Sequence, residues 1–308
     1  MRLSPLTPIL EQQGFVIIDG GLATELERQG HDLNHSLWSA RLLADDPDAI
    51  LRAHRAFLNA GADCIISSSY QATPQGLRQH GFSAAEAKAL ILKSWELAHA
   101  ACAEAAPGRT GPAPIAAASI GPYGAYLADG SEYRGDYGLS LDALVEFHRE
   151  RFELLAPVAT LLAFETIPSL DEAEAIRRLL LEAPEVNAWV TFSCRDAERI
   201  SDGHSIEEAA SVFDDLPQVI AVGVNCTDPV YVGALIRRLR ARGGNKDVVV
   251  YPNSGEPYCA ETKTWSPANE SQGLASLAPA WLADGARLIG GCCRVAAADL
   301  REIIASLR

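Results

Sequence analysis

The chain has no excess of positive charge. Its 308 residues include 26 lysine and arginine residues against 40 aspartate and glutamate residues, which gives a net charge of −14 at pH 7. Nucleic acids and anionic membrane surfaces attract basic patches, so this balance argues against either of them as a partner. We expect a small-molecule partner instead, and the acidic balance favours a cationic one.

Long apolar runs and linkers are absent as well. The first residues, Met1-Arg2-Leu3-Ser4-Pro5-Leu6-Thr7-Pro8, contain no hydrophobic leader, and no later run approaches the length of a transmembrane helix. We therefore expect a cytoplasmic protein. No Pro/Gly/Ser-rich linker divides the chain and 48% of its residues are hydrophobic, so residues 1–308 are expected to form one domain. The sequence leaves the oligomeric state open.

An even set of cysteines is also missing. The chain has seven, an odd number in a protein too large to need disulfide staples, so we expect reduced thiols. Where such thiols cluster, they favour metal or redox chemistry. Cys64 and Cys102 stand within apolar patterns, where a cysteine usually serves as a small buried hydrophobic residue. Cys194 and Cys259 have no clear assignment.

Short apolar runs that end in turn residues predict eight β-strands, at residues 15–21, 63–70, 114–122, 161–168, 188–194, 219–226, 248–255 and 287–293. Runs that are apolar throughout are typical of strands covered on both faces. Helical patterns separate them, with capping boxes at Ser83 and Ser205 and a helix start at Asp228-Pro229. Eight such alternations indicate an α/β protein with a single-domain (β/α)8 barrel of the TIM type.

A doubly wound open sheet is the rival fold. It would carry Gly-x-Gly-x-x-Gly after the first strand, where this chain has Asp19-Gly20-Gly21-Leu22-Ala23-Thr24. In a (β/α)8 barrel the residues at the carboxyl ends of the strands line one pocket. The runs end in Asp19-Gly20-Gly21, Ser67-Ser68-Ser69-Tyr70, Ser119-Ile120-Gly121-Pro122, Glu165-Thr166, Ser193-Cys194, Asn225-Cys226, Asn253-Ser254-Gly255-Glu256 and Gly291-Cys292-Cys293.

Three cysteines at these strand ends suggest a metal site. Cys226 ends one run, and Cys292 and Cys293 end another. Three thiolates form a soft, tetrahedral ligand set that selects zinc and leaves a fourth position for a substrate. Adjacent side chains on a regular strand point to opposite faces, so a break near Gly290-Gly291 is needed to turn both thiols inward. Two alternatives stay open, namely three core cysteines or a disulfide between the adjacent pair.

Two carboxylates and three polar residues complete the predicted pocket. Asp19 and Glu165 each end an apolar strand, and they are either structural carboxylates or the groups that hold the ammonium of an amino-acid substrate. Asn225, Ser193 and Asn253 are weaker substrate-binding candidates, because polar residues at strand ends often only satisfy loop backbone.

The segment at residues 122–138 is rich in tyrosine and acidic residues. An ordinary surface loop is one interpretation. Loops of this length with several tyrosines are more often lids or binding elements, and tyrosine faces and carboxylates hold onium cations. We therefore expect this segment to contribute to the binding of a cationic substrate.

Three short motifs carry a family resemblance. Asp19-Gly20-Gly21, Val224-Asn225-Cys226 and Gly290-Gly291-Cys292-Cys293-Arg294 resemble, in sequence order and over almost the whole chain, the signature elements of the zinc-dependent homocysteine S-methyltransferase family. The segment at residues 122–138, together with Tyr251-Pro252-Asn253-Ser254-Gly255-Glu256, resembles the branch that uses S-methylmethionine.

This resemblance implies a (β/α)8 barrel with zinc held by Cys226, Cys292 and Cys293. It also implies that Asp19 and Glu165 bind the amino group of homocysteine. The implied reaction transfers a methyl group from S-methylmethionine, or less efficiently from S-adenosylmethionine, to zinc-activated homocysteine thiolate and forms methionine.

The sequence leaves three alternatives to this function open. Betaine-dependent relatives are similar at the zinc site, so the choice of donor depends on the loops. A noncatalytic zinc protein would use a fourth protein ligand, for example Cys194 or Cys259. A metal-dependent carbon–carbon lyase would need histidine ligands, and none of the seven histidines ends a predicted strand.

Overall fold

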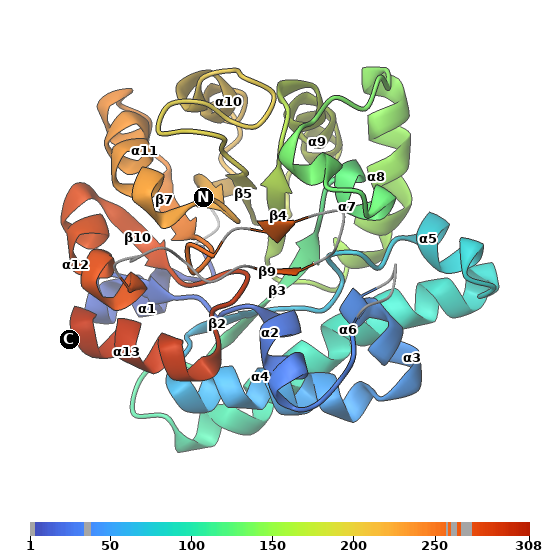
Figure 1. Ribbon diagram of the computed structural model, residues 1–308, viewed down its shortest axis with the longest axis horizontal. Coiled ribbons are helices and arrows are strands. Elements are labelled where there is room, and N and C mark those ends of the chain that lie inside the picture. Colours follow the sequence, from blue (N-terminus) through green and yellow to red (C-terminus); the bar gives the residue numbers. More distant parts are fainter. Residues whose placement is uncertain (1–3, 34–37, 257, 260–263, 266–272) are drawn as a thin grey trace.

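The computed structural model describes residues 4–33, 38–256, 258–259, 264–265 and 273–308. Eight parallel strands form its centre, in the order β1-β10-β7-β6-β5-β4-β3-β2. A parallel bridge between Ile18 and Cys64 joins the two ends of this order and closes the barrel. The predicted single-domain (β/α)8 barrel is confirmed, and Figure 1 shows the helices arranged around the strands.

All eight predicted strands are present, but each is shorter than its apolar run. The strands are β1 (Val16–Ile17), β2 (Cys64–Ile66), β3 (Ile115–Ile120), β4 (Leu162–Ile167), β5 (Ala188–Phe192), β6 (Val219–Asn225), β7 (Asp247–Tyr251) and β10 (Ala286–Ile289). Most of the polar residues predicted at strand ends therefore lie in the loops that follow the strands. Loop backbone can turn side chains in directions that a regular strand does not allow.

Helices follow the strands as predicted. They are α2 (Leu22–Arg28), α3 (Leu42–Asp45), α4 (Pro47–Ala60), α5 (Pro74–Gln79), α6 (Ala84–Ala105), α7 (Tyr123–Leu127), α8 (Leu141–Leu155), α9 (Leu170–Glu182), α10 (Ile206–Ser211), α11 (Pro229–Ala241), α12 (Leu274–Asp284) and α13 (Ala297–Leu307). Short 3-10 turns are η1 (Trp38–Arg41), η2 (Ala106–Gly108) and η3 (Ser131–Tyr133). The capping boxes at Ser83 and Ser205 are confirmed, as is the Asp228 cap that precedes Pro229.

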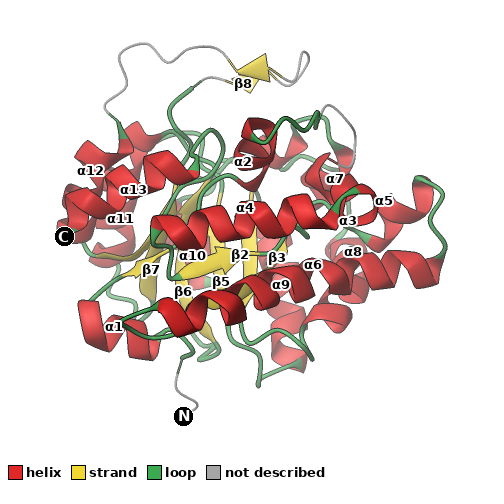
Figure 2. Cartoon of the chain, turned by 90° about the horizontal axis from the view of Figure 1, so that it is seen from below, coloured by secondary structure: helices red, strands yellow, loops and turns green. Residues whose placement is uncertain are grey.

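Helix α1 (Thr7–Gln13) was not predicted. Leu6 and Ile9 are buried in the same apolar cluster as Val16 and Leu288, which places α1 against the amino ends of the strands. A hairpin of β8 (Tyr258–Cys259) and β9 (Thr264–Trp265) lies at the opposite end of the barrel, on the side of α2 and α7 (Figure 2). Helix α1 was not predicted because its two turns are too short for a hydrophobic period to be recognised in the sequence.

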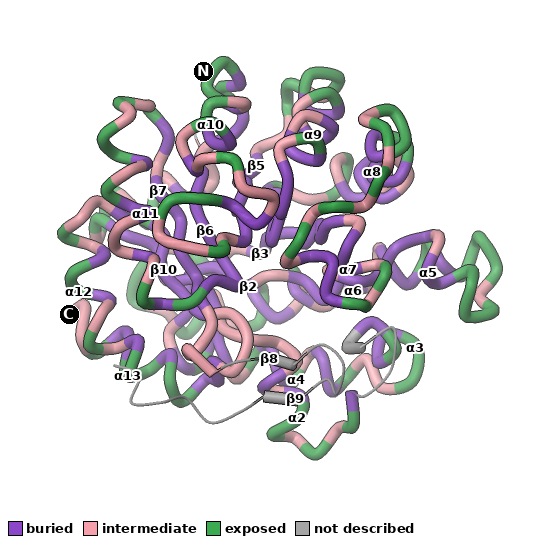
Figure 3. The backbone as a smooth tube through the Cα atoms, turned by 45° about the horizontal axis from the view of Figure 1, so that its top comes forward, coloured by how far each residue is buried: buried purple, intermediate pink, exposed green. Residues whose placement is uncertain are grey.

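The core has two layers because strand side chains alternate between the barrel interior and the helices. Val16 and Ile18 belong to the inner cluster, whereas Ile17 belongs to the outer one. Figure 3 shows the buried strands at the centre and exposed residues on the outer helix faces. Cys64 is buried in the inner layer and Cys102 in the outer layer, as predicted for cysteines that serve as hydrophobic residues. None of the helices among the described residues is both long and apolar enough to span a bilayer.

One buried histidine makes the fold sensitive to acid. His54 of α4 is fully buried, and neither ring nitrogen has a hydrogen-bond partner among the described residues. Burial disfavours the charged imidazolium and lowers the pKa of His54 to about 4. The unfolded chain therefore binds this proton more readily than the folded protein does. The contribution of neutral, buried His54 to the stability of the fold is therefore complete above about pH 6.5, and it is lost as the pH falls towards 4.

We predict that His54→Leu makes unfolding less dependent on pH. The wild-type free energy of unfolding falls relative to that of the variant between pH 6.5 and 4, by up to about 1.4 kcal/mol per pH unit. Denaturant unfolding of both proteins at several pH values measures this difference. Parallel pH profiles for the two proteins would contradict the assignment.

Candidate functional site

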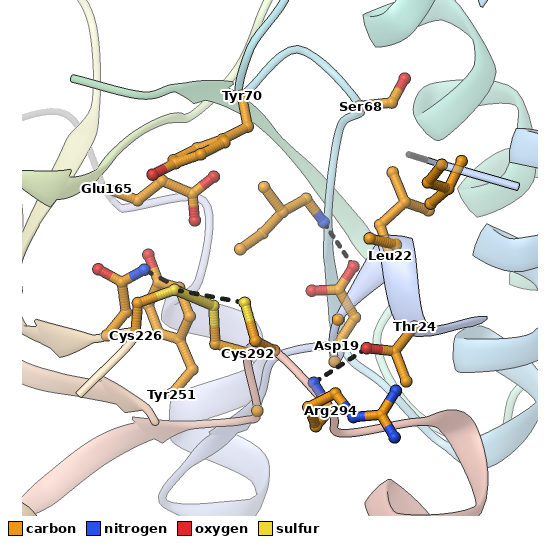
Figure 4. A pocket seen from close by; sticks show the side chains of 18 of the residues that line it. Asp19, Leu22, Thr24, Ser68, Tyr70, Glu165, Cys226, Tyr251, Cys292 and Arg294 are labelled. Carbon is orange, nitrogen blue, oxygen red and sulfur yellow. Dashed lines mark hydrogen bonds between the residues drawn. A yellow bond between two sulfur atoms is a disulfide. The ribbon is translucent and has the colours of Figure 1, made fainter. Parts of the chain in front are cut away.

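The carboxyl ends of the strands surround one pocket. Its wall combines residues from the ends of β1, β2, β4, β6, β7 and β10 with residues of helix α2. Figure 4 shows Asp19, Glu165, Cys226 and Cys292 pointing into this space. The predicted carboxylates and thiols therefore share one pocket, as the barrel topology requires.

The three predicted ligand cysteines lie together. Their sulfur atoms are all within 4.8 Å of one another. The Cys226 Sγ lies 4.0 Å from the Cys293 Sγ, and Cys226 is joined to Cys292 by a disulfide (Figure 4). We expected reduced thiols, and for this pair the expectation is wrong. The predicted barrel already brings Cys226 and Cys292 together although they are 66 residues apart, but the odd number of cysteines gave no sign that the pair would be oxidised.

The chain turns sharply where it carries these thiols. Strand β10 ends at Ile289, and the next residues leave the regular strand, which confirms the predicted break at Gly290-Gly291. Cys226 has a φ of 46° and Arg294 a φ of 65°, so both lie in the left-handed region. This backbone directs Cys292 and Cys293 to the same pocket although they are adjacent in sequence.

The sulfur spacing suits a tetrahedral metal ion. Zinc–sulfur bonds of about 2.3 Å place neighbouring sulfur atoms about 3.8 Å apart. The Cys226–Cys293 separation is close to this value, and reduction of the disulfide would free the Cys226 and Cys292 sulfur atoms to join Cys293 as ligands. Among the described residues, no histidine, acidic side chain or further cysteine joins these three as a fourth ligand. Cys194 is not part of it, and the side chain of Cys259 lies outside the described residues.

Asp19 is held at the end of β1. It is buried, and its Oδ2 accepts a hydrogen bond from the Ile66 N–H at 2.9 Å. Burial raises the pKa of Asp19 well above its usual value, and the nearby Glu165 charge adds to this effect.

Glu165 lies within β4 and faces the same pocket. It is buried, accepts a hydrogen bond from the Ser119 hydroxyl, and has a pKa raised to about 7 by burial. Two buried carboxylates that disfavour each other's charge are stabilised by a cation between them. No lysine lines this pocket, and Arg294 is the one arginine in its described wall.

Comparison with known proteins agrees with this geometry. The homocysteine S-methyltransferase family model matches residues 16–307. The chain belongs to this family. It is 48% identical over 311 residues to the homocysteine S-methyltransferase YbgG of Bacillus subtilis, covering 99% of this chain and 98% of that protein. It is 46% identical over 303 residues to the Escherichia coli homocysteine S-methyltransferase, covering 97% of each.

Solved structures give the same result. The metallated form of the homocysteine methyltransferase MmuM from Escherichia coli matches with a TM-score of 0.88 and 42% identity, covering 98% of this chain and 99% of that one. The oxidised form of the same protein matches with a TM-score of 0.89 and 43% identity over the same shares. The chain is thus an enzyme of the homocysteine S-methyltransferase type.

The weaker predicted site residues of the enzyme have different surroundings. Asn225 lines the pocket, but its amide is used within the protein, because Oδ1 accepts from the Thr166 N–H at 2.7 Å and from Thr191 Oγ1 at 2.8 Å. Ser193 donates to the Glu132 carbonyl at 2.8 Å and is not in the pocket wall. Asn253 is also outside the wall, and its buried Oδ1 has no partner among the described residues.

Two pocket residues received no role from the sequence. The Tyr70 hydroxyl lies beside Glu165 in Figure 4, and Thr24 of α2 accepts a hydrogen bond from the Arg294 N–H at 2.9 Å. Tyr70 closes the run Ser67-Ser68-Ser69-Tyr70, so its position at a strand end was the available signal. Thr24 gives no such signal because it lies inside helix α2 and not at a strand end.

The segment at residues 122–138 is more ordered than a loop. It contains α7 and η3, and the Tyr123 N–H donates to Glu172 of α9 at 2.6 Å. The Tyr123 ring packs against Phe147 of α8 at 4.9 Å and against Tyr137 at 5.3 Å. Tyr123 and Tyr137 thus pack against each other, and Tyr123 also packs against α8. From the sequence we expected the tyrosines of this segment to contact a cationic substrate.

We predict that Gly21→Ala disrupts the thiol cluster. A Cβ on Gly21 would lie 2.6 Å from the Cys292 carbonyl oxygen, so the backbone that carries the thiol must shift. Overpacking of this kind costs about 1–3 kcal/mol. Thermal unfolding measures the loss of stability, and thiol cross-linking measures the disruption of the thiol cluster. Gly108→Ala is the matched control because nothing lies within 4 Å of its Cβ, and equal behaviour of the two variants would contradict the prediction.

Proposed function

We propose that this enzyme transfers a methyl group from S-methylmethionine to homocysteine and forms methionine, with zinc held by Cys226, Cys292 and Cys293. The observation that carries the proposal is one pocket in which three clustered sulfur atoms lie beside two buried carboxylates. The metallated form of the Escherichia coli relative supports a metal at this site.

Zinc bound by three thiolates would lower the pKa of a substrate thiol in the fourth position and hold it as the nucleophilic thiolate. The protein supplies the geometry. The backbone turns around Cys226 and Cys293 fix the thiols on one side of the pocket, so a substrate sulfur has a defined direction of approach.

Asp19 and Glu165 are the groups that we assign to the homocysteine ammonium. Both carboxylates are buried in the pocket wall and lack a cationic partner there. An incoming ammonium favours their ionised forms, against the effect of burial. Both carboxylates are buried, and a site of low polarity assists a reaction in which a positive sulfonium and a negative thiolate become two neutral thioethers.

Two alternatives remain candidates for experiment. Betaine carries a cation that the same pocket charge would attract, so donor choice requires a direct comparison. A noncatalytic zinc site would be closed by a fourth protein ligand, and the three-member cluster of the described residues favours catalysis.

We predict about one zinc ion per chain in the reduced enzyme. Serine in place of Cys226, Cys292 or Cys293 removes most zinc and abolishes activity, because a two-thiolate site holds the ion too weakly. Cys64→Ser and Cys102→Ser are the controls, since both thiols lie in the core away from the pocket. Metal analysis and methionine formation measure the outcome, and equal losses at all five positions would indicate a structural role.

Oxidation should act through the same thiols. Coupling of Cys226 to Cys292 removes two ligands, so the oxidised enzyme takes up no zinc, and reductant with zinc restores both metal and activity. Zinc analysis before and after reduction tests this part of the prediction. An oxidised enzyme that retains stoichiometric zinc would disagree with it.

We predict that S-methylmethionine is the preferred donor. S-adenosylmethionine should react more slowly because its adenosine must also be accommodated, and betaine should hardly react. Methionine formation with each donor, at fixed homocysteine and zinc concentrations, gives the ranking as kcat/KM. A clear preference for betaine would assign the enzyme to the other branch. Activity with none of the three would support the noncatalytic alternative.

A further inference from the structure

The pocket has an outer part that the thiols and the two buried carboxylates do not occupy. Its wall continues along helix α2 through Thr24 and Glu27, which are three residues apart and share one helix face, to His31 beyond the helix. Arg294, in the turn after β10, lines the same part. The side chains of Glu27 and Arg294 are 49% and 36% exposed, whereas the two inner carboxylates are buried. This pair of opposite charges therefore marks the solvent side of the pocket.

Arg294 is held in place through both its backbone and its side chain. Its N–H donates to Thr24 Oγ1 at 2.9 Å, and Figure 4 shows the two residues side by side. Its Nε donates to Glu256 Oε2 at 2.6 Å. With a φ of 65°, the backbone of Arg294 has a conformation that favours glycine. The turn thus carries a long charged side chain at a position where glycine would be the easier choice.

The guanidinium of Arg294 keeps donors for a ligand. Among the described residues it donates a hydrogen bond through Nε alone, so the hydrogens on Nη1 and Nη2 stay available. Its planar fork matches the two oxygens of a carboxylate. Glu27 Oε2 lies 3.5 Å from Nη1 and offers an acceptor beside these donors. An α-amino acid carries a carboxylate and an ammonium on one carbon, so its two charges fit this pair.

The location of the pair favours the methyl donor over homocysteine. In the proposed function the homocysteine sulfur lies at the thiols and its ammonium at the buried carboxylates, which fills the inner part of the pocket. The donor sulfur must then approach the acceptor sulfur from the solvent side. Arg294 is the residue next to Cys293, and adjacent Cα atoms are about 3.8 Å apart. The two methylene groups of S-methylmethionine can therefore bridge the distance between the reacting sulfur and the pair.

We propose that Arg294 and Glu27 determine donor specificity by binding the α-amino-acid end of the methyl donor. Arg294 takes the carboxylate and Glu27 the ammonium. The assignment rests on the proposed function, since it requires a sulfonium amino acid as substrate. S-adenosylmethionine has the same amino-acid end, whereas betaine has a carboxylate but no primary ammonium and would engage Arg294 alone.

The reaction leaves the charges of this amino-acid end unchanged. The bond between the methyl carbon and the donor sulfur breaks, and its electron pair stays on that sulfur as a neutral thioether. The homocysteine thiolate, which has already lost its proton, forms the new bond to the methyl carbon. Arg294 and Glu27 therefore stabilise the bound donor and the transition state alike, so their loss raises the KM for the donor with little change in kcat.

The test uses two altered donors, S-methylmethionine without its carboxylate and S-methylmethionine without its α-ammonium. The zinc-loaded wild type should use the complete donor about tenfold better than either one, measured as kcat/KM, because each lacks a charge-assisted hydrogen bond. Arg294→Gln should lose the preference for the carboxylate and keep the preference for the ammonium. Glu27→Gln should show the opposite pattern.

Two further variants separate recognition from folding. Arg294→Lys, which keeps the charge without the planar fork, should recover part of the preference for the carboxylate. Arg28→Gln is the matched control, since Arg28 is an exposed arginine of the same helix as Glu27 and lies outside the pocket wall. It should leave both preferences unchanged. Zinc content and the KM for homocysteine, measured for every variant, should stay close to the wild-type values.

Unchanged preferences in Arg294→Gln and Glu27→Gln would overturn the inference while leaving the proposed function intact. A higher KM for homocysteine with an unchanged donor KM would also overturn it, because Arg294 would then bind the acceptor. Equal losses with all three donors, together with loss of zinc, would make the pair structural. A wild-type enzyme that uses no sulfonium donor at all would overturn the proposed function, and the inference with it.

Discussion

The contact between the turns that follow β1 and β10 is the constraint on which the site depends. The Gly291 N–H donates to the Asp19 carbonyl at 2.9 Å, and the Gly21 N–H donates to the Val295 carbonyl at 2.8 Å. Glycine is required because a Cβ on Gly21 would meet the Cys292 carbonyl oxygen. This contact joins the carboxyl ends of β1 and β10 and, in the same few residues, sets Asp19 beside the adjacent thiols. The Asp19 carboxylate and the Cys292 and Cys293 thiols are therefore positioned by the same pair of hydrogen-bonded turns.

The second feature of the site is its concentration of negative groups. Asp19 and Glu165 are both buried in the wall of the pocket that holds the three thiols, and burial raises the pKa of both carboxylates. Such an arrangement is unfavourable in the absence of cations. Zinc, the ammonium of the acceptor and the sulfonium of the donor would supply the missing positive charge. The enzyme would thereby select its substrates by charge as well as by shape.

The sequence predicted the barrel and the thiols well, because both depend on short-range patterns. Apolar runs identify strands, and polar residues at their ends identify a pocket. The α1 helix was missed since two turns show no period. The disulfide between Cys226 and Cys292 was not predicted because the odd number of cysteines favours reduced thiols, although the barrel topology did predict that the two residues meet.

The central claim is that three cysteines hold zinc and leave its fourth position to the substrate thiol. X-ray absorption at the zinc edge of the reduced, zinc-loaded enzyme counts the sulfur ligands directly. The account predicts three sulfur atoms at about 2.3 Å without homocysteine and four with it. Four sulfur ligands before homocysteine is added, or a ligand count that homocysteine does not change, would contradict the account.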